Sequence, residues 1–244
     1  MRKNLELGYY TARFQCGKRS LNVCRSWGNK THSACVVGCV SCCGIVQGTG
    51  FAGLHRLIFL RQFFCSPRDI GAVAPSSRAL AELITEAAQV HNAATVVEFG
   101  PGTGAITEVI LRKLRDDSQF FAFELNPRFV EFLRRKCPDV RVIHDCASNT
   151  RRHLEAAGLE SCDCIVSGLP WAAFDEQLQD ELLDAALDVL RPGGRFTTYA
   201  YLQGAWLPAG RRFRQKLIDR FAEVRRTRTL WWNLFPAFVY YATK

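Results

Sequence analysis

The sequence predicts an α/β fold built on a seven-stranded, mostly parallel sheet with helices on both faces and an antiparallel last strand. From residue 67 onwards, short runs rich in β-branched and aromatic residues alternate with amphipathic segments of helical period. Such alternation is typical of parallel strands joined by crossover helices. Only Trp232–Pro236 separates the last two strand-like runs, which is too short for a crossover, so the final strand should run antiparallel.

The first expected helix begins at Pro75-Ser76-Ser77, where Ser76 or Ser77 is a natural N-cap, and continues to about Val90. The other helices are recognised by an apolar face, a starting proline or a closing Pro-Gly-Gly. They are Thr103–Leu114, Pro127–Lys136, Arg151–Ala157, Asp175–Leu190, which Pro192-Gly193-Gly194 follows, and Ala209–Phe221. The expected strands are Thr95–Phe99, Gln119–Glu124, Val140–Ile143, Cys162–Ser167, Arg195–Tyr201, Glu223–Trp231 and Ala237–Ala242.

The composition is that of a globular domain with a sizeable core. The chain has 244 residues, of which 48% are hydrophobic and 23% are charged, and this balance excludes an intrinsically disordered protein. A membrane-spanning helix needs about 18 or more consecutive apolar residues. The nearest candidate, 34–46, is shorter and is interrupted by Gly38, Ser41 and Gly44, so no spanning helix is expected.

The positive charge is concentrated near the N-terminus. The net charge is +9, and nine of the 32 Lys and Arg residues but only one of the 23 acids, Glu6, lie in residues 1–64. The rest of the chain is nearly neutral, which argues against a broad nucleic-acid surface, so a nucleic-acid partner is not expected. The basic N-terminal part is compatible with a nearby anionic membrane.

Six of the eleven cysteines lie within Cys16–Cys43. The spacing of Cys35, Cys39, Cys42 and Cys43 lacks the second, separated pair that a zinc site usually has, so we favour free thiols over a metal site. The scattered later cysteines suggest a reducing cytoplasm.

The chain divides into three expected regions. Residues 1–50 have no clear period and are expected to be a poorly ordered, Cys-rich extension. Residues 51–66 are apolar with interspersed arginines, and form an expected helix that either packs on the core or lies at a membrane surface. Residues 67–244 form the globular domain.

A glycine-rich turn, Gly100-Pro101-Gly102-Thr103-Gly104, follows the first strand of the expected sheet. Glycine lets the backbone turn sharply and approach a ligand closely, and the following helix offers free N–H groups to an anion. The spacing Gly100-x-Gly102-x-x-Ala105 also fits the dinucleotide fingerprint. The loop alone therefore leaves two anions open, a pyrophosphate or the carboxylate of an amino acid.

Three acidic residues stand around this loop: Glu98 two residues before the first glycine, Glu124 at the end of the second strand and Asp145 after the third. With the glycine loop they resemble the class I S-adenosylmethionine-dependent methyltransferases over about residues 67–244, rather than a dehydrogenase. The resemblance implies a Rossmann-like fold and S-adenosyl-L-methionine as cofactor, with Glu98 at the methionine ammonium, Glu124 at both ribose hydroxyls and Asp145 at the adenine amino group. It assigns no metal, and its cofactor-binding residues are Glu98, Gly100, Pro101, Gly102, Thr103, Gly104, Glu124, Leu125, Asp145, Ser167 and Gly168.

The segment Val166–Trp171 ends the fourth strand, at the edge where ligands bind in such sheets. It resembles the Asn-Leu-Pro-Tyr element of the rRNA adenine dimethyltransferases, in which the Asn accepts from the base and the ring stacks on it. Gly168 stands where that Asn would be and has no side-chain acceptor. Those enzymes also carry a helical domain after the catalytic one, so an RNA acceptor is the second choice.

A closer resemblance is to the bacterial phospholipid N-methyltransferases. It implies that the acceptor is phosphatidylethanolamine, methylated in up to three rounds towards phosphatidylcholine. It also implies a cytoplasmic enzyme that is peripheral on the inner face of the membrane, with a phospholipid as its partner. The matching segments are Gly71–Arg78, Val97–Gly104, Ser167–Pro170, Pro192–Gly194 and Trp232–Ala237.

Methyl transfer is an in-line displacement that depends on positioning and desolvation. Tyr199 and Tyr201, near the end of the fifth strand, are the expected catalytic residues, because their rings would tolerate the developing ammonium by cation–π contact. Arg68 or Arg78 is expected to bind the lipid phosphate. The other expected substrate-binding residues are Leu169, Pro170, Trp171 and Asn233.

Two other classes of function stay open. One is an rRNA adenine dimethyltransferase-like or small-molecule methyltransferase, and the other is a relative that binds the cofactor without turnover. The complete glycine loop and the two glutamates argue against the second. No obligate protein partner is indicated, and neither His144, after a strand, nor His153, on an expected surface helix, is assigned as a base.

Overall fold

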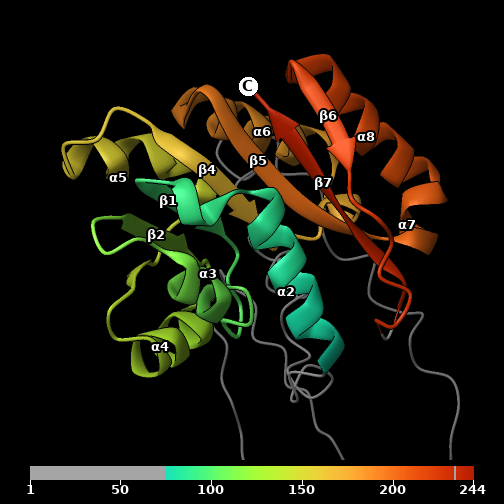
Figure 1. Ribbon diagram of the computed structural model, residues 1–244. Coiled ribbons are helices and arrows are strands. Elements are labelled where there is room, and N and C mark those ends of the chain that lie inside the picture. The colour runs from blue at the N-terminus through green and yellow to red at the C-terminus, as the bar shows by residue number, and fades with distance from the viewer. Residues whose placement is uncertain (1–74, 234) are drawn as a thin grey trace, which may run out of the picture. The chain divides into compact units, whose positions relative to one another are not determined.

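The computed structural model describes residues 75–233 and 235–244, which contain a seven-stranded sheet in the order β3-β2-β1-β4-β5-β7-β6 (Figure 1). Neighbouring strands from β3 to β5 run parallel. β7 runs antiparallel to both β5 and β6. The predicted fold class is therefore confirmed. The strands are β1 (Thr95–Phe99), β2 (Gln119–Phe123), β3 (Arg141–Ile143), β4 (Cys162–Ser167), β5 (Leu190–Tyr201), β6 (Glu223–Arg226) and β7 (Ala237–Thr243).

Helices cover both faces of the sheet (Figure 1). One face packs against α2 (Pro75–Ala87), α3 (Thr107–Lys113) and α4 (Pro127–Lys136), and the other against α5 (Thr150–Ala156), α6 (Glu176–Val189) and α8 (Pro208–Arg220). The short α7 (Leu202–Trp206) follows β5 directly. Fully buried side chains of the two helix layers include Ile84, Ile110 and Leu133 on one side and Leu154, Leu183 and Leu217 on the other.

The central strand β1 is buried along its whole length, as expected for a parallel strand covered on both faces. Val97 and Phe99 point to the α6 side of the sheet, while Val96 belongs to the cluster on the α2 side. This alternation also places Glu98 on the same side as Val96, towards α3. The strand thus brings a carboxylate into an interior that is otherwise apolar.

The loops at the carboxyl ends of the parallel strands are joined by backbone hydrogen bonds. The N–H of Gly100 after β1 donates to the carbonyl of Phe123 in β2 at 2.9 Å, and the N–H of Gly168 after β4 donates to Phe99 in β1 at 2.8 Å. The N–H of Glu124 donates to Ile143 in β3 at 3.0 Å. The ends of four strands are thereby held at one edge, where ligands bind in open α/β sheets.

At the opposite, amino-terminal edge, Asp163 of β4 holds the start of β1. Its Oδ2 accepts from the backbone N–H groups of Ala94 at 2.9 Å and Thr95 at 2.8 Å. Its Oδ1 lies 2.5 Å from Nε of Arg191. This carboxylate has a structural role far from the glycine loop along β1.

Several element boundaries differ from the sequence-based expectation. The helix expected from Thr103 begins at Thr107, because Gly104 takes a left-handed conformation (φ 82°) that a right-handed helix cannot include. The first helix begins at Pro75, so Ser76 and Ser77 lie in its first turn rather than at the N-cap. Pro192-Gly193-Gly194 lies inside β5.

The strand expected over Glu223–Trp231 ends at Arg226. Beyond that residue, the hydroxyl of Thr227 accepts the N–H of Val239 at 3.0 Å and replaces a backbone partner. The N–H of Thr227 also donates to the carbonyl of Val239 at 2.9 Å. Farther along, an isolated bridge between Leu230 and Ala237 continues the pairing. α7 and three short 3₁₀ helices were not expected, because a single turn is too short to show a helical period. The 3₁₀ helices are Val90–Asn92, Ala147–Asn149 and Trp171–Ala173.

The expectations for 1–50 and 51–66, and for Arg68 and the Cys35–Cys43 group, fall outside the described residues. Within the part of the chain that is described, no helix has the length and apolar character that crossing a bilayer requires.

Candidate active site

The glycine loop after β1 has three left-handed glycines, with φ angles of 68° at Gly100, 56° at Gly102 and 82° at Gly104. A Cβ at Gly100 would lie 2.6 Å from Cδ2 of Leu169, and one at Gly104 would lie 2.7 Å from Cδ2 of Leu133. A Cβ at Gly102 would meet no atom within 4 Å. The outer two glycines are therefore fixed by packing as well as by their backbone angles, while the middle one faces open space that a ligand can enter.

Helix α4 supports the glycine loop from below. Nζ of Lys136 donates to the carbonyl of Thr103 at 3.0 Å and also lies 3.0 Å from the Glu108 carboxylate on α3. The loop is thus tied to two helices that pack on the same face of the sheet. Such support keeps the backbone N–H groups of a binding loop in a fixed orientation.

Glu98 is fully buried, and its carboxylate is only half satisfied. The Thr107 hydroxyl donates to its Oε2 at 2.8 Å, while Oε1 has no hydrogen-bond partner among the described residues. Burial raises the pKa of Glu98 to about 8, against the opposing effect of the Thr107 hydrogen bond, and the nearby Glu124 raises it further. A buried acceptor without a partner suggests that a donor from outside the chain completes it.

Glu124, which follows β2, is also buried and contacts the glycine loop directly. Its Oε2 accepts from the N–H of Gly102 at 3.0 Å, and its Oε1 accepts from the N–H of Asn126 at 2.8 Å. Burial raises the pKa of Glu124, although the N–H groups of Asn126 and Gly102 oppose the shift. Each carboxylate oxygen keeps a further lone pair for a hydroxyl donor.

Asp145, which follows β3, accepts four hydrogen bonds. Oδ1 accepts from the N–H of Cys146 and from Asn149, each at 2.8 Å, and Oδ2 accepts from Arg152 at 2.7 Å and lies 2.8 Å from Nε2 of His153. Burial opposes ionisation, but the bonds from His153 and Asn149 outweigh it and lower the pKa of Asp145 to about 2. Asp145 is therefore a fixed anion.

A small pocket lies between the loops that follow β1, β2, β3 and β4. It holds about 30 Å³, and its walls are mainly apolar with carboxylates at two positions. The structure thus brings together several residues that the sequence assigned to one site, at the ends of separate strands. The lining residues are Gly100, Phe123, Glu124, Leu125, Asp145, Cys146, Ala147, Leu169, Phe174, Leu178 and Leu182.

Gly168 has a packing reason that the sequence could not show. A Cβ at this position would lie 2.6 Å from the carbonyl oxygen of Gly100 and 3.6 Å from that of Phe99. Real Cβ atoms do not approach backbone this closely, so a side chain here would displace the glycine loop. The same closeness leaves no room for an asparagine in this arrangement.

We expect Gly168→Ala to destabilise the protein by roughly 1–3 kcal/mol, because overpacking forces backbone shifts. Gly204→Ala is the matched control, since a Cβ on Gly204 in α7 meets nothing within 4 Å and alanine is the better helix former. Urea unfolding of both variants measures the difference. Equal midpoints would contradict the packing argument.

The side chains of Trp171 and Ser167 are hydrogen-bonded to each other. The buried Ser167 hydroxyl accepts from Nε1 of Trp171 at 3.0 Å, and the Trp171 ring stacks on Phe213 with centroids 5.0 Å apart. The structure therefore places the Trp171 ring in the core rather than on a substrate-facing wall, and we assign it no substrate contact. Leu169 is buried beside the glycine loop, and Pro170 is half-buried.

The expected acceptor residues lie farther along the same edge of the sheet. The rings of Tyr199 and Tyr201 are 5.7 Å apart at the end of β5, and the exposed Tyr201 lies 6.0 Å from the Phe235 ring. Burial raises the pKa of Tyr199, so its phenol is neutral near pH 7. Asn233 donates to the carbonyl of Phe235 at 2.9 Å, and Arg78 is exposed in the first turn of α2.

Sequence reasoning missed two residues that hold the site, and it placed a third, His153, on the surface. Thr107 stands one turn after Gly104, a spacing that could have identified it as a partner for Glu98. Lys136 lies at the end of the helix after β2, and nothing in the sequence pattern marks it as a support of the loop. His153 lies beside Asp145 with its ring 5.5 Å from that of Phe123, rather than on an open helix surface.

Comparison with known proteins places the chain among related enzymes. Residues 96–194 match a family described as a methyltransferase domain. An ornithine lipid N-methyltransferase from Singulisphaera acidiphila is 31% identical over 187 residues, which cover 75% of this chain and 93% of that protein.

Two solved structures share the fold at low identity. The O-methyltransferase from Bacillus cereus in complex with SAH has a TM-score of 0.55 and 17% identity, covering 78% of this chain and 91% of its own. The O-methyltransferase TomG from Streptomyces achromogenes in complex with SAM also has a TM-score of 0.55, with 20% identity and coverage of 76% and 89%.

Proposed function

The chain belongs to the class I S-adenosylmethionine-dependent methyltransferases, and on this basis we propose that it methylates the amine of a membrane lipid, with phosphatidylethanolamine and its partly methylated forms as acceptors. The observation that carries the proposal is the 31% identity to an ornithine lipid N-methyltransferase over nearly the whole of that protein. That relative favours ornithine lipid as the second candidate. Both lipids present a primary amine to the methyl donor.

The residues around the glycine loop fit the cofactor of this family. When bound, S-adenosylmethionine supplies an electrophilic methyl group on a sulfonium. We assign the unpartnered Oε1 of Glu98 to the ammonium of its methionine part and the open face of Gly102 to the carboxylate. Glu124 has lone pairs left for the ribose hydroxyls. Pro101, Thr103 and Gly104 complete the loop.

The small apolar pocket between Leu125, Leu169 and Asp145 is our assignment for the adenine ring. Its volume of about 30 Å³ is that of a single water, so the wall side chains would have to move apart for a ring to enter. Since four donors already occupy Asp145, an adenine amino group would replace one of them. Arg152 is the donor that leaves most easily, because its side chain is 72% exposed.

At the proposed acceptor site, we assign the role of stabilising the reacting amine to aromatic rings rather than to a charged base. The amine attacks as the free base and becomes more positive during transfer, and the faces of Tyr199 and Tyr201 would stabilise that charge. We assign Asn233, Leu169 and Pro170 to the wall of the acceptor site. Arg78, together with Arg68 outside the described residues, is our assignment for the lipid phosphate. A lipid acceptor implies an enzyme that works at the cytoplasmic membrane face.

The proposal is tested by incubating the full chain with labelled S-adenosylmethionine and vesicles that contain one acceptor each. We expect label in the lipid fraction with phosphatidylethanolamine or with ornithine lipid, in products that chromatography separates by the number of methyl groups. Phosphatidylcholine vesicles and structured RNA are the controls. Label in RNA alone, or in no aminolipid at all, would overturn the lipid assignment.

A further inference from the structure

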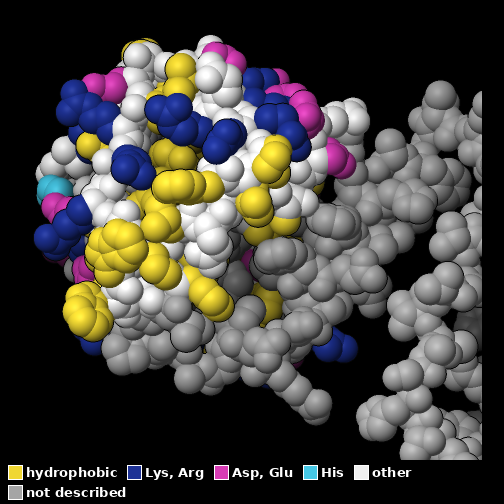
Figure 2. Space-filling view, turned by 90° about the vertical axis from the view of Figure 1, so that its right-hand side faces the viewer, with side chains coloured by type: hydrophobic (Ala, Val, Ile, Leu, Met, Phe, Trp, Pro, Cys, Tyr) yellow, Lys and Arg dark blue, Asp and Glu magenta, His cyan; other side chains and the backbone are white. Residues whose placement is uncertain are grey.

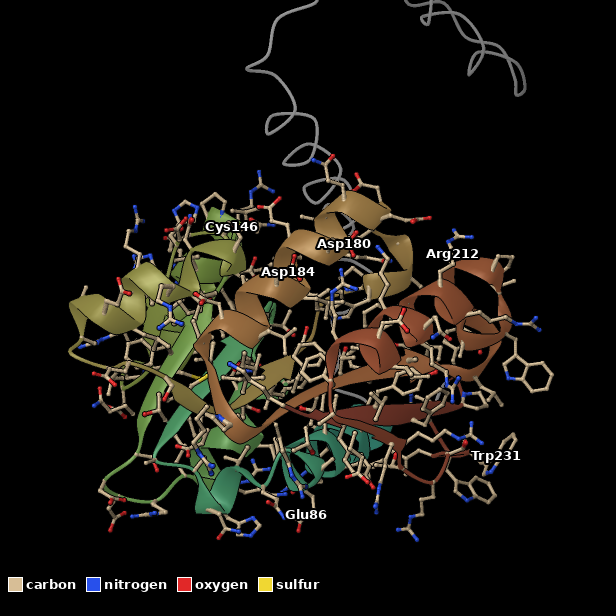
Figure 3. All side chains as sticks on the ribbon, turned by 90° about the horizontal axis from the view of Figure 1, so that it is seen from above. Glu86, Cys146, Asp180, Asp184, Arg212 and Trp231 are labelled. Atoms are coloured by element: carbon tan, nitrogen blue, oxygen red, sulfur yellow. The ribbon has the colours of Figure 1, made fainter. Side chains whose placement is uncertain are left out.

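Five large hydrophobic side chains are exposed together at one corner of the described domain. They come from the end of α7 and the start of α8, and from the loop between β6 and β7. Trp232 is 98% exposed, Trp206 is 68% and Trp231 is 66%. Figure 3 shows the Trp231 ring pointing away from the sheet. We call this set the aromatic corner: Trp206, Leu207, Trp231, Trp232 and Phe235.

The two chain segments of the aromatic corner are neighbours in space. The N–H of Leu202, at the start of α7, donates to the carbonyl of Pro236 at 2.8 Å. The ring of Phe235 lies 6.0 Å from that of Tyr201, the last residue of β5. Figure 2 shows hydrophobic side chains gathered on this side of the molecule, next to a group of Lys and Arg side chains. Both segments of the corner therefore meet where α7 begins and the β6–β7 loop ends.

A basic pocket of about 420 Å³ adjoins this corner, with Trp206 in its wall. Arg214, Arg225 and Arg226 line it, and none of its described lining residues is acidic. Arg225 forms an ion pair with Glu223, whereas Arg214 and Arg226 form none with any described residue. The Arg226 guanidinium instead lies 5.3 Å from the centre of the Phe238 ring. We call this site the arginine pocket.

Exposed indoles beside arginines without an ion pair to any described residue are the side chains expected at a lipid headgroup layer. A folded domain rarely exposes a contiguous apolar patch unless something covers it. Trp is enriched where hydrocarbon meets water, because its ring is apolar and its N–H is polar. Arginine forms bidentate hydrogen bonds with phosphate, and each basic residue strengthens binding to an anionic membrane. All of these properties occur together in a lipid headgroup layer.

We propose that the aromatic corner and the arginine pocket bind the surface of an anionic lipid bilayer, with the indoles among the headgroups and the arginines facing lipid phosphates. Two identical copies that joined through this corner would bring like charges together. The chain's own residues 1–64 carry nine basic residues and one acid, so they too lack the complementary charge. An anionic bilayer supplies it.

Membrane binding at the aromatic corner would also help catalysis, an inference that rests on the proposed lipid acceptor. Tyr201 lies between Phe235 of the corner and Tyr199 of the acceptor site, with ring distances of 6.0 and 5.7 Å. A bilayer bound at the corner would therefore present its headgroups next to the acceptor site. A lipid amine could then reach the methyl donor without leaving the membrane surface.

The test is flotation of the full chain with vesicles of phosphatidylcholine and phosphatidylglycerol, an anionic lipid that attracts basic residues, without aminolipid or methyl donor. We expect the triple variant Trp206→Ser, Trp231→Ser, Trp232→Ser to bind at least about tenfold more weakly, because the buried apolar area is lost. The matched control is Phe132→Ser, an exposed aromatic ring on α4. It should bind as the unchanged protein does.

A second variant separates the electrostatic part. Arg214→Ser, Arg226→Ser should lose about fivefold for each arginine and show a weaker salt dependence. Arg128→Ser, an exposed arginine on α4, is its control. Calorimetry of S-adenosylmethionine binding checks that each variant is folded, since a folded variant should bind as the unchanged protein does. If the triple tryptophan variant does not fold, the vesicle binding of the double arginine variant tests the proposal.

The proposal is overturned if both corner variants bind vesicles as tightly as the unchanged protein. It is also overturned if neither the unchanged protein nor any variant binds vesicles, while sedimentation shows that the unchanged protein is a dimer and the triple variant a monomer. The aromatic corner would then bind a second copy of the chain. Vesicle binding that depends on the corner, without methylation of any aminolipid, would support this surface and refute the proposed acceptor. The two proposals therefore fail separately.

Discussion

Glu124→Ala is expected to weaken the binding of S-adenosylmethionine at least about 100-fold while the sheet stays intact. The lost carboxylate would have accepted two ribose hydroxyls, and hydrogen bonds to a charged group contribute about 1.5–3 kcal/mol each. The change also removes the acceptor that holds the N–H of Gly102, which would loosen the middle of the glycine loop. Isothermal titration calorimetry at pH 7.5 measures the loss.

Asp163→Ala is the matched control for this prediction. Asp163 also accepts two backbone N–H groups, but at the amino-terminal edge of the sheet, away from the pocket. We expect this variant to lower the free energy of unfolding and to keep its affinity for the cofactor once folded. An Asp163→Ala loss of affinity as large as that of Glu124→Ala would show that the effect follows from a loosened sheet. The assignment of Glu124 to the ribose would then be withdrawn.

Cofactor binding is expected to strengthen as pH rises from 6 to 7.5 and to release a proton from Glu98. Without ligand the pKa of Glu98 is about 8, so the group is mostly protonated in this range. An ammonium beside Oε1 favours the ionised form and lowers the pKa. The dissociation constant should then fall by up to about tenfold per pH unit, below the range in which the ligand's own amino group titrates.

The same shift has the opposite effect on the stability of the ligand-free protein. Because the folded-state pKa of Glu98 lies above its ordinary value of 4.5, the folded state binds the additional proton between those two pH values. Stability is therefore lost as pH rises from about 4.5 to 8, by up to about 1.4 kcal/mol per pH unit for this group. Glu98→Gln should remove this slope, because glutamine does not titrate.

Glu98→Gln should also remove the pH dependence of binding and weaken it by roughly 10- to 100-fold at pH 7.5, since a desolvated charge pair is lost. Calorimetry in buffers of different ionisation enthalpy counts the released protons. The control is Glu131→Gln, which alters an exposed carboxylate on α4 that pairs with Arg135. A proton count of zero for the unchanged protein would contradict the role of Glu98.

The sequence predicted the elements that rely on period and on glycine. β1 is a short run rich in β-branched and aromatic residues, and Gly100, Gly102 and Gly104 require left-handed angles that other residues rarely adopt. The antiparallel last strand followed from loop length alone. These features depend on short stretches of chain, which is why they can be recognised without coordinates.

Features that depend on distant contacts could not be predicted in this way. Gly168 is excluded from carrying a side chain by the carbonyl of Gly100, which is far from it in sequence. Trp171 follows the fourth strand, a position that suggested a contact with substrate. Its ring instead stacks on Phe213 of α8 in the core. The partnership of Asp145 with His153 likewise depends on how α5 packs.

The place of β7 in the sheet sets an order for folding during synthesis. β6 is an edge strand whose single neighbour is β7, although β6 is made first. The parallel half of the sheet, with the whole glycine loop, can pair as soon as β5 has left the ribosome. Until residues 237–243 emerge, β5 and β6 expose unpaired edges that can aggregate. A ribosome that stalls within the β6–β7 loop would therefore hold a nascent chain whose cofactor loop is formed but whose sheet has unpaired, aggregation-prone edges.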